Sequence, residues 1–278
     1  MPLSPRMIQV ESAVTVDGAR LSWTVEGAGE PLLLIAGQAT GRAGWDPVIP
    51  ELSKTFRVIR FDHRGIAHST EGNLNRYSTR AFAEDTVAVL DAAGVQKAHI
   101  YGHSMGGRVA QWLAIDHADR VATLVLAATS AGGALGTSRD NAATQALTSG
   151  DPVRLQPLFF DEEWAGKHQE AVHSYFNAPA CARVKSRHFI ASRNHDTLSS
   201  LSTIHAPTLI IHGTEDLLTP LENALVLYKT IPRATLIKIA GGRHGIHLDH
   251  PETMRWIRDF ILRKGAHLEE GTGYLPTA

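Results

Sequence analysis

Six short runs of mostly apolar residues constrain the fold of this chain more than any other feature of its sequence. The runs are near-continuous in apolar character instead of alternating, which is typical of strands that are covered on both faces. Segments with helical periodicity lie between several of them, and this alternation predicts an α/β fold with a mostly parallel sheet. The runs are Leu32–Ile35, Val58–Phe61, His99–Tyr101, Val121–Ala128, Thr208–Ile211 and Leu236–Ile239.

Two further segments near the N-terminus have the alternating pattern of a half-buried hairpin. Ile8–Val16 and Leu21–Val25 flank Asp17-Gly18, a dipeptide that favours a tight turn. We expect this hairpin at an antiparallel edge of the sheet. Together with the six runs it predicts a mostly parallel eight-stranded sheet flanked by helices.

Three helices have recognisable ends in the sequence. Ser78–Ala93 is followed by Gly94, and Pro251–Lys264 is followed by Gly265, a residue type that commonly ends helices. Thr219-Pro220-Leu221-Glu222 has the pattern of a capping box with proline at the first helical position.

The segment from Ala131 to Ala206 interrupts the alternation, because no convincing apolar strand occurs in it. It is too long for an ordinary connection and has helix-compatible sequence. We predict a helical cap, residues 131–206, inserted after strand six into a core formed by residues 1–130 and 207–278. A plain structural subdomain is the alternative interpretation. We expect the tail Gly271–Ala278 to be flexible.

One pentapeptide has the pattern of a serine nucleophile. Gly102-His103-Ser104-Met105-Gly106 matches G-x-S-x-G between an apolar, strand-like run and a helical segment. A strand-to-helix turn at the serine strains its backbone, and small residues at positions 102 and 106 avoid clashes there. The pattern predicts Ser104 as the nucleophile, and a serine at an ordinary tight turn is the alternative.

A nucleophilic serine requires a base, and the base requires a residue that orients it. Asp216 follows the run Thr208–Ile211, and His244 follows the run Leu236–Ile239. The carboxyl ends of parallel strands meet at one edge of a sheet, so both side chains can converge on Ser104. We predict that His244 takes the serine proton and that Asp216 holds the imidazole in the required tautomer.

Both partners have rivals nearby in the sequence. Glu215 could be the acid in place of Asp216, although its longer side chain fits less deeply into the loop. His247 and His250 compete with His244, which the flanking glycines favour.

The tetrahedral intermediate of acyl transfer requires two hydrogen-bond donors at its oxyanion. The backbone N–H of Met105, directly after the nucleophile, is one expected donor. The other is expected from the loop after Leu32–Ile35, where Ala36-Gly37-Gln38 occurs, and we assign it to the N–H of Gln38.

With these residues the chain resembles the α/β-hydrolase superfamily from about Ile8 to Lys264. Asp62-His63-Arg64-Gly65 resembles the D-x-R-G turn of many members, and Trp45 also fits. Two positions depart from the common pattern. Ala36-Gly37 stands where many members have His-Gly, and Ala67-His68 stands in a segment where R-G-x-G-x-S is common.

The resemblance is strongest to bacterial esterases and lactonases with a small helical cap, such as 3-oxoadipate enol-lactonase-like and aclacinomycin methylesterase-like proteins. It implies hydrolysis of a small or medium apolar carboxylic ester or lactone through an acyl-enzyme intermediate. Substrate contacts are expected from Gly37, His103 and Trp164. Carbon–carbon bond hydrolysis of a meta-cleavage-type product, cofactor-free perhydrolase activity and non-catalytic ligand binding remain alternatives.

The composition of the chain argues against some classes of binding partner. Lys and Arg number 27 and Asp and Glu 28, a balance that argues against nucleic acid as a partner. No segment has the length and apolar character of a membrane span, and Met1–Val10 lacks the apolar run of a secretory signal. The single cysteine, Cys181, cannot form an intrachain disulfide, and we expect it to be a buried thiol. These features predict a cytoplasmic protein.

Cofactor motifs do not occur in the sequence. Neither a G-x-x-x-x-G-K-[ST] loop nor a G-x-G-x-x-G run that opens a helix after the first strand is found. The group His244, His247, Asp249 and His250 lacks the H-E-x-x-H spacing of a metal site. We expect no metal and no cofactor, a small-molecule ester or lactone as the binding partner, and a monomer or homodimer.

Overall fold

The structure, a computed structural model, describes residues 10–265. It has one sheet of eight strands in the order β1-β2-β4-β3-β5-β6-β7-β8. β2 pairs antiparallel with β1 and β4, and the remaining neighbours pair parallel. The predicted mostly parallel eight-stranded sheet is confirmed. The strands are β1 (Val10–Val14), β2 (Arg20–Glu26), β3 (Pro31–Ile35), β4 (Arg57–Phe61), β5 (Ala98–His103), β6 (Val121–Ala127), β7 (Thr208–Gly213) and β8 (Ala234–Ile239).

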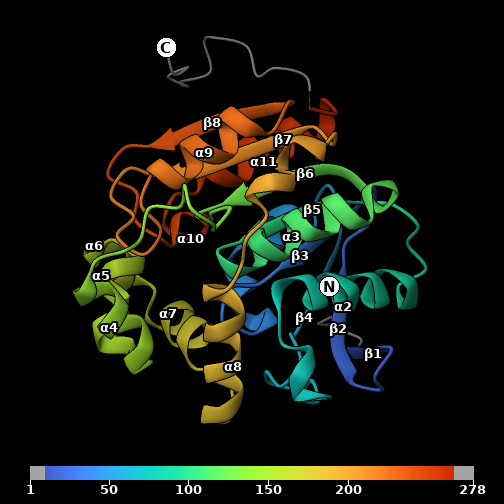
Figure 1. Ribbon diagram of the computed structural model, residues 1–278, viewed down its shortest axis with the longest axis horizontal. Helices are drawn as coiled ribbons and strands as arrows, with labels where there is room; N and C mark the ends of the chain where they lie inside the picture. The colour runs from blue at the N-terminus through green and yellow to red at the C-terminus, as the bar shows by residue number, and fades with distance from the viewer. Residues whose placement is uncertain (1–9, 266–278) are drawn as a thin grey trace, which may run out of the picture.

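Helices cover both faces of this sheet (Figure 1). α2, α3 and α9 pack on one face, and α1 and α11 pack on the other. The α-helices are α1 (Ile49–Leu52), α2 (Thr79–Ala92), α3 (Met105–Asp116), α4 (Asn141–Ser149), α5 (Pro152–Phe159), α6 (Glu162–Lys167), α7 (Gln169–Phe176), α8 (Ala182–Arg193), α9 (Glu222–Thr230), α10 (Ile246–Asp249) and α11 (Glu252–Leu262). The 3-10 helices are η1 (Arg42–Val48), η2 (Leu74–Arg76), η3 (Ala118–Arg120) and η4 (Leu198–Thr203).

The two-sided cover explains why the strands are apolar at nearly every position. In β3, Leu33 and Ile35 join the core cluster on the α2 and α3 face, whereas Leu32 and Leu34 join the cluster on the other face. Successive strand residues point to opposite faces, so both sets are buried only when both faces are covered.

The N-terminal hairpin forms as the sequence predicts. The register pairs Val14 with Arg20, and Gly18 in the turn has a φ of 80°, a conformation that glycine adopts without strain. The start of the predicted strand at Ile8 and the tail Gly271–Ala278 lie outside the described residues.

Two of the three helix ends predicted from the sequence are found in the structure, and the third is not. The hydroxyl of Ser78 accepts a hydrogen bond from the N–H of Ala81 at the start of α2, and α11 ends shortly before Gly265. The predicted capping box at Thr219 is wrong, since α9 begins at Glu222 with Leu221 as its N-cap. The N–H of Thr219 donates to Asp216 and its carbonyl oxygen accepts from His212, so Thr219 belongs to the turn that holds Asp216 and not to the helix.

Helices α4–α8 and η4 lie between β6 and β7, within residues 131–206, which we call the insert. Figure 1 shows α4–α7 grouped at the lower left of the view, with α8 beside them. Phe160 and Tyr175 of the insert share a core cluster with Trp45 of η1, and α7 packs against η1. The insert is therefore packed on the molecule through an apolar contact.

Candidate active site

Ser104 lies at a sharp turn between β5 and α3. Its φ is 56° and its ψ is −119°, an unfavourable conformation for a residue with a side chain. A Cβ at Gly102 would lie 2.3 Å from the carbonyl oxygen of Gly106, and a Cβ at Gly106 would lie 2.0 Å from that of Ile35. Glycine at both positions thus allows the close approach of helix and strand that holds Ser104 in this turn.

The structure brings Ser104, His244 and Asp216 together in one hydrogen-bonded chain. The Oγ atom of Ser104 lies 2.9 Å from Nε2 of His244, and Nδ1 of His244 lies 2.7 Å from Oδ2 of Asp216. Because a carboxylate oxygen accepts, Nδ1 carries the proton and Nε2 is left to accept from the serine. This is the geometry that a serine nucleophile and its base require.

Asp216 is fixed in position by the start of the segment that follows it. Its Oδ1 atom accepts hydrogen bonds from the N–H groups of Leu218 (2.9 Å) and Thr219 (2.8 Å). Burial raises the pKa of this carboxyl, but the charge interaction and hydrogen bond with His244 act in the opposite direction, and the net effect lowers the pKa. Asp216 is therefore an anion at neutral pH that orients the imidazole.

The alternative candidates for the acid and the base do not contact Ser104 or His244 in the same way. Glu215 is exposed, whereas Asp216 is buried. The ring of His247 is buried against His103, with ring centroids 4.0 Å apart, and His250 lies 3.3 Å from Glu252. Among the described histidines, only His244 is hydrogen-bonded to Ser104.

The loop after β3 lies against the nucleophile. A Cβ at Gly37 would be 3.5 Å from the Cβ of Ser104. In the described chain the N–H of Gln38 has no hydrogen-bond acceptor, and the N–H of Met105 belongs to the first turn of α3, where helix geometry leaves it unpaired. Both predicted donors are thus free for an oxyanion. Nε2 of His63 donates to the carbonyl oxygen of Ala36 (3.1 Å), which helps to hold the loop where many relatives have His-Gly.

The D-x-R-G segment is held in place by hydrogen bonds of its charged side chains. Arg64 is fully buried and donates hydrogen bonds to both carboxylate oxygens of Asp85 and to Asp17. Asp62 accepts from the N–H of Arg42 (2.7 Å). Ala67 has a φ of 47°, so it keeps the left-handed conformation that glycine favours at this position of the common pattern.

Ser104 lines a small central cavity that shares wall residues with two larger cavities. The central cavity, about 30 Å³, is lined by Ser104, His244, Gly37 and Gln38 among others. A polar cavity of about 300 Å³ shares Arg108 and Arg139 with the central cavity, and an apolar cavity of about 370 Å³ shares Phe159 and Tyr175 with it. Gly37 is thus placed where a substrate can reach it.

The other two predicted substrate contacts lie elsewhere. His103 is 1% exposed and lines none of the three cavities, because its ring is enclosed by Trp45, Tyr175, His244 and His247. Trp164 also lines none of them, since it stacks on His168 and packs against Phe160. The structure therefore places neither side chain in the wall of a cavity that adjoins Ser104.

Several residues at the site were not predicted from the sequence. Thr129 donates from Oγ1 to the carbonyl oxygen of Ser104 (2.7 Å) and so supports the strained turn. Arg108 and Arg139 both line the central and polar cavities. Arg108 is one helical turn after Ser104, a spacing that places it on the same side of α3. No sequence pattern marks Arg139, which lies in the insert.

Some expectations concern features away from Ser104. Cys181 is exposed, so the prediction of a buried thiol is wrong. Within residues 10–265 no group of three or more His, Cys, Asp or Glu side chains is arranged to hold a metal ion. No helix in the same range has the length and apolar character needed to cross a membrane.

Comparison with known proteins gives consistent matches over most of the chain. Residues 30–169 match the sequence model of the α/β-hydrolase fold. The RutD protein of Azorhizobium caulinodans, named as a candidate carbamate hydrolase, is 31% identical over 246 residues, which cover 84% of this chain and 91% of that protein. The 2-hydroxymuconate semialdehyde hydrolase of Pseudomonas sp. (strain CF600) is 30% identical over 264 residues, covering 87% and 90%.

Solved structures agree with these sequence matches. The esterase RhEst1 from Rhodococcus sp. superposes with a TM-score of 0.80 and 27% sequence identity, covering 92% of this chain and 99% of that chain.

Proposed function

The chain belongs to the α/β-hydrolase fold family, and from this premise we propose that it is a serine hydrolase that cleaves a small or medium carboxylic ester or lactone with an apolar part. The observation that carries the proposal is the hydrogen-bonded chain from Ser104 through His244 to Asp216. A binding protein has no need of a buried carboxylate that orients an imidazole toward an accessible serine.

In the first step, Oγ of Ser104 attacks the acyl carbon while Nε2 of His244 takes the serine proton. The carbonyl oxygen becomes an oxyanion and accepts from the N–H groups of Gln38 and Met105. The protonated imidazole, stabilised by Asp216, then gives its proton to the leaving oxygen as the bond between that oxygen and the acyl carbon breaks. The product is an acyl-enzyme and a free alcohol, or the open alcohol end of a lactone.

In the second step, water replaces the alcohol. Nε2 of His244 takes a proton from the water as its oxygen attacks the acyl carbon, and the same proton returns to Oγ of Ser104 when the acyl bond breaks. The carboxylic acid leaves and the enzyme is restored.

The apolar cavity supports a substrate with an apolar part. Its walls carry Leu147, Leu155, Phe159, Tyr175 and Phe176, and all five belong to the insert. Its volume of about 370 Å³ suits a small or medium group. The similarity to an esterase of 27% identity also supports ester hydrolysis.

The test is the Ser104→Ala variant, assayed with p-nitrophenyl butyrate. We expect its turnover to fall by roughly 10³-fold or more, because the covalent route is lost. Ser202→Ala, which changes an exposed serine in η4, is the matched control and should behave as wild type. A fluorophosphonate probe should label the wild type and not Ser104→Ala. Near-wild-type turnover by Ser104→Ala, or no labelling of the wild type, would overturn the proposal.

A second reaction is favoured by the relative at 30% identity that is named 2-hydroxymuconate semialdehyde hydrolase. The same serine, histidine and aspartate would then serve hydrolysis of a carbon–carbon bond. Comparing kcat/KM for p-nitrophenyl butyrate, a p-nitrophenyl carbamate and a ring-cleavage dienoate distinguishes the reactions. A strong preference for the dienoate would replace ester hydrolysis as the function.

A further inference from the structure

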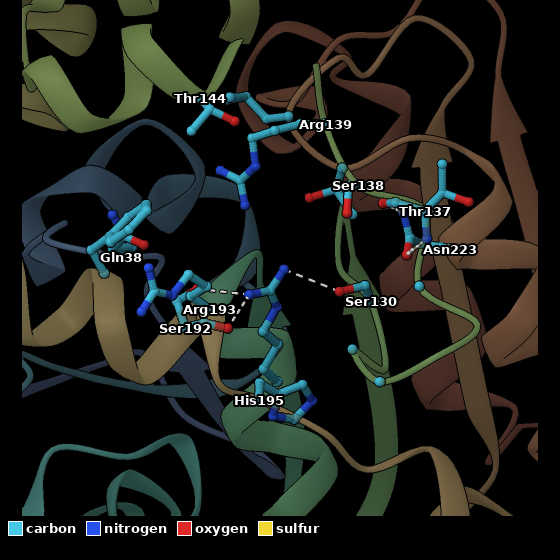
Figure 2. A pocket seen from close by; sticks show the side chains of 17 residues that line it. Gln38, Ser130, Thr137, Ser138, Arg139, Thr144, Ser192, Arg193, His195 and Asn223 are labelled. Atoms are coloured by element: carbon cyan, nitrogen blue, oxygen red, sulfur yellow. Dashed lines mark hydrogen bonds between the residues drawn. The ribbon is translucent and has the colours of Figure 1, made fainter. Parts of the chain in front are cut away.

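Two arginines reach the space beside Ser104 from separate elements. Arg108 comes from α3, and Arg139 comes from the segment directly before α4. Both line the central and polar cavities. Figure 2 shows Arg139 extending into the polar cavity. The dashed lines to Ser130 and Ser192 in that figure mark the hydrogen bonds that Arg108 donates.

Neither arginine forms a hydrogen bond or ion pair with an acidic residue in the described part of the chain. Arg108 donates only to neutral oxygens, those of Ser130 (3.0 Å) and Ser192 (2.8 Å for the hydroxyl), and its Nε has no acceptor. Arg139 makes no hydrogen bond or ion pair with any residue from 10 to 265. By contrast, Arg64, also buried, is paired with two aspartates.

The walls of the polar cavity contain no carboxylate. Besides the two arginines they present Arg193 and neutral hydrogen-bonding side chains, namely Gln38, Ser130, Thr137, Ser138, Thr144, Ser192, His195, Thr219 and Asn223. The acids nearest in sequence are engaged elsewhere, since Asp140 caps α4 and Asp196 accepts from the N–H of Leu198. Asp216 attracts Arg139 but is hydrogen-bonded to His244.

The two positive charges therefore oppose each other in a partly enclosed space. Burial, together with the like charge of Arg139, lowers the pKa of Arg108 to about 10, so it remains a cation at neutral pH. An anion bound between the two guanidiniums would compensate both charges and occupy free donors. Arginine suits a carboxylate in particular, because its planar fork can donate two parallel hydrogen bonds.

The apolar cavity, which also adjoins the central cavity, has different chemistry. The central cavity shares Gln38, Leu147, Phe159 and Tyr175 with the apolar cavity. A substrate that spans these adjoining cavities would thus meet cations and hydroxyls in the polar cavity, Ser104 in the central cavity, and aromatic rings in the apolar cavity.

We propose that the substrate carries a carboxylate, which binds in the polar cavity between Arg108 and Arg139 while its apolar part occupies the cavity lined by Phe159, Tyr175 and Phe176. This inference rests on the proposed hydrolase function and specifies its substrate class. The carboxylate does not react. It holds the scissile carbonyl at Ser104.

The test compares charged and neutral esters of the same size. One pair places the carboxylate on the acyl side, mono-p-nitrophenyl glutarate against p-nitrophenyl valerate. The other pair places it on the alcohol side, 4-carboxyphenyl valerate against 4-carbamoylphenyl valerate. In at least one pair we expect kcat/KM of the wild type to favour the carboxylate by about tenfold or more, the gain typical of charge-assisted hydrogen bonds.

Variants locate the source of this preference. Arg139→Met should reduce the ratio of the two kcat/KM values to near one, and Arg139→Glu should invert it. Lys185→Met removes an exposed cation at the rim of the apolar cavity and should keep the wild-type ratio. Circular dichroism and Tm establish that each variant is folded. Calorimetric binding of mono-p-nitrophenyl glutarate to Ser104→Ala, with and without Arg139→Met, gives a readout that needs no turnover.

The outcomes separate the two proposals. Ser104-dependent hydrolysis of the neutral ester without a preference for the carboxylate in either pair would overturn the anion site and leave the hydrolase function standing. A preference lost in Lys185→Met and kept in Arg139→Met would overturn the assigned position. If no ester is turned over, the hydrolase function fails, and weaker glutarate binding after Arg139→Met would still support the anion site, whereas equal binding would overturn it.

Discussion

His103 donates a hydrogen bond from Nε2 to the backbone carbonyl oxygen of His244, and the two atoms lie 2.8 Å apart. The bond joins the turn that carries the nucleophile to the loop that carries the base. Burial, chiefly, lowers the pKa of His103 to about 3, so the ring is neutral and its Nδ1 can accept from the hydroxyl of Tyr175 (3.2 Å). His103 therefore holds the loop of His244 from outside the central cavity.

The first prediction concerns this positioning bond. His103→Phe keeps a ring in the aromatic packing and removes the donor to His244. We expect kcat to fall about tenfold, equivalent to roughly 1.4 kcal/mol, because the base loop loses one fixed contact. Steady-state kinetics measure the change. His247→Phe is the control, because it alters the same stack and the ring of His247 has no hydrogen bond within the described chain. Equal losses of kcat in both variants would mean that the packing of the rings, and not the hydrogen bond to His244, accounts for the effect.

A second prediction distinguishes the two adjacent acids. Asp216→Asn keeps the size of the side chain but removes the negative charge that orients His244. We expect kcat to fall on the order of 10³–10⁴-fold, as expected when the imidazole loses the required tautomer. Glu215→Gln changes the exposed neighbour and should leave kcat within about twofold of wild type. The reverse order of effects would transfer the role to Glu215.

The close approach of α3 to β3 leads to a third prediction, on stability. Gly106→Ala places a methyl group 2.0 Å from the carbonyl oxygen of Ile35, which the packed helix and strand cannot accommodate. We expect the free energy of unfolding to fall by about 3 kcal/mol or more, or the variant to remain insoluble. Gly166→Ala in α6 meets no atom within 4 Å and should gain up to about 1 kcal/mol from helix propensity. Urea denaturation monitored by circular dichroism gives both values.

The fourth prediction concerns acid stability. Burial lowers the pKa of His188 to about 3, and its Nε2 donates to the carbonyl oxygen of Arg64 (3.0 Å). In the unfolded chain an ordinary histidine has a pKa near 6.5, so as the pH falls below about 6.5 the unfolded state takes up a proton that the folded state does not. Each such histidine therefore destabilises the protein by roughly 2 kcal/mol at pH 5 relative to pH 7.

His188→Gln tests whether His188 destabilises the protein as the pH falls. Glutamine can also donate to the carbonyl oxygen of Arg64, but it does not titrate. The loss of unfolding free energy between pH 7 and pH 5 should be smaller in His188→Gln than in the wild type by roughly 2 kcal/mol. His205→Gln, which replaces an exposed histidine, should keep the wild-type difference. An identical pH dependence in wild type and His188→Gln would show that His188 is not the neutral buried group inferred from the structure.

Much of the fold could be predicted from local sequence because local physics decides it. Continuous apolar runs such as Leu32–Ile35 require cover on both faces, and a Gly-x-Ser-x-Gly segment between a strand and a helix requires a sharp turn. The order of Ser104, Asp216 and His244 after three strands followed from the same reasoning, since parallel strands end at one edge. These inferences depend on residues that are neighbours along the chain.

Only the tertiary structure decided which residues meet across long separations. Sequence could not fix that His103 is hydrogen-bonded to His244, or that Trp164 stacks on His168, because side-chain direction depends on packing from other elements. It also could not place Arg139, whose position beside Arg108 results from how the insert packs against the sheet. The sequence determined the strands, their turns and the types of residue at the site, whereas long-range packing determined which of those residues touch and which charges within residues 10–265 remain without a partner.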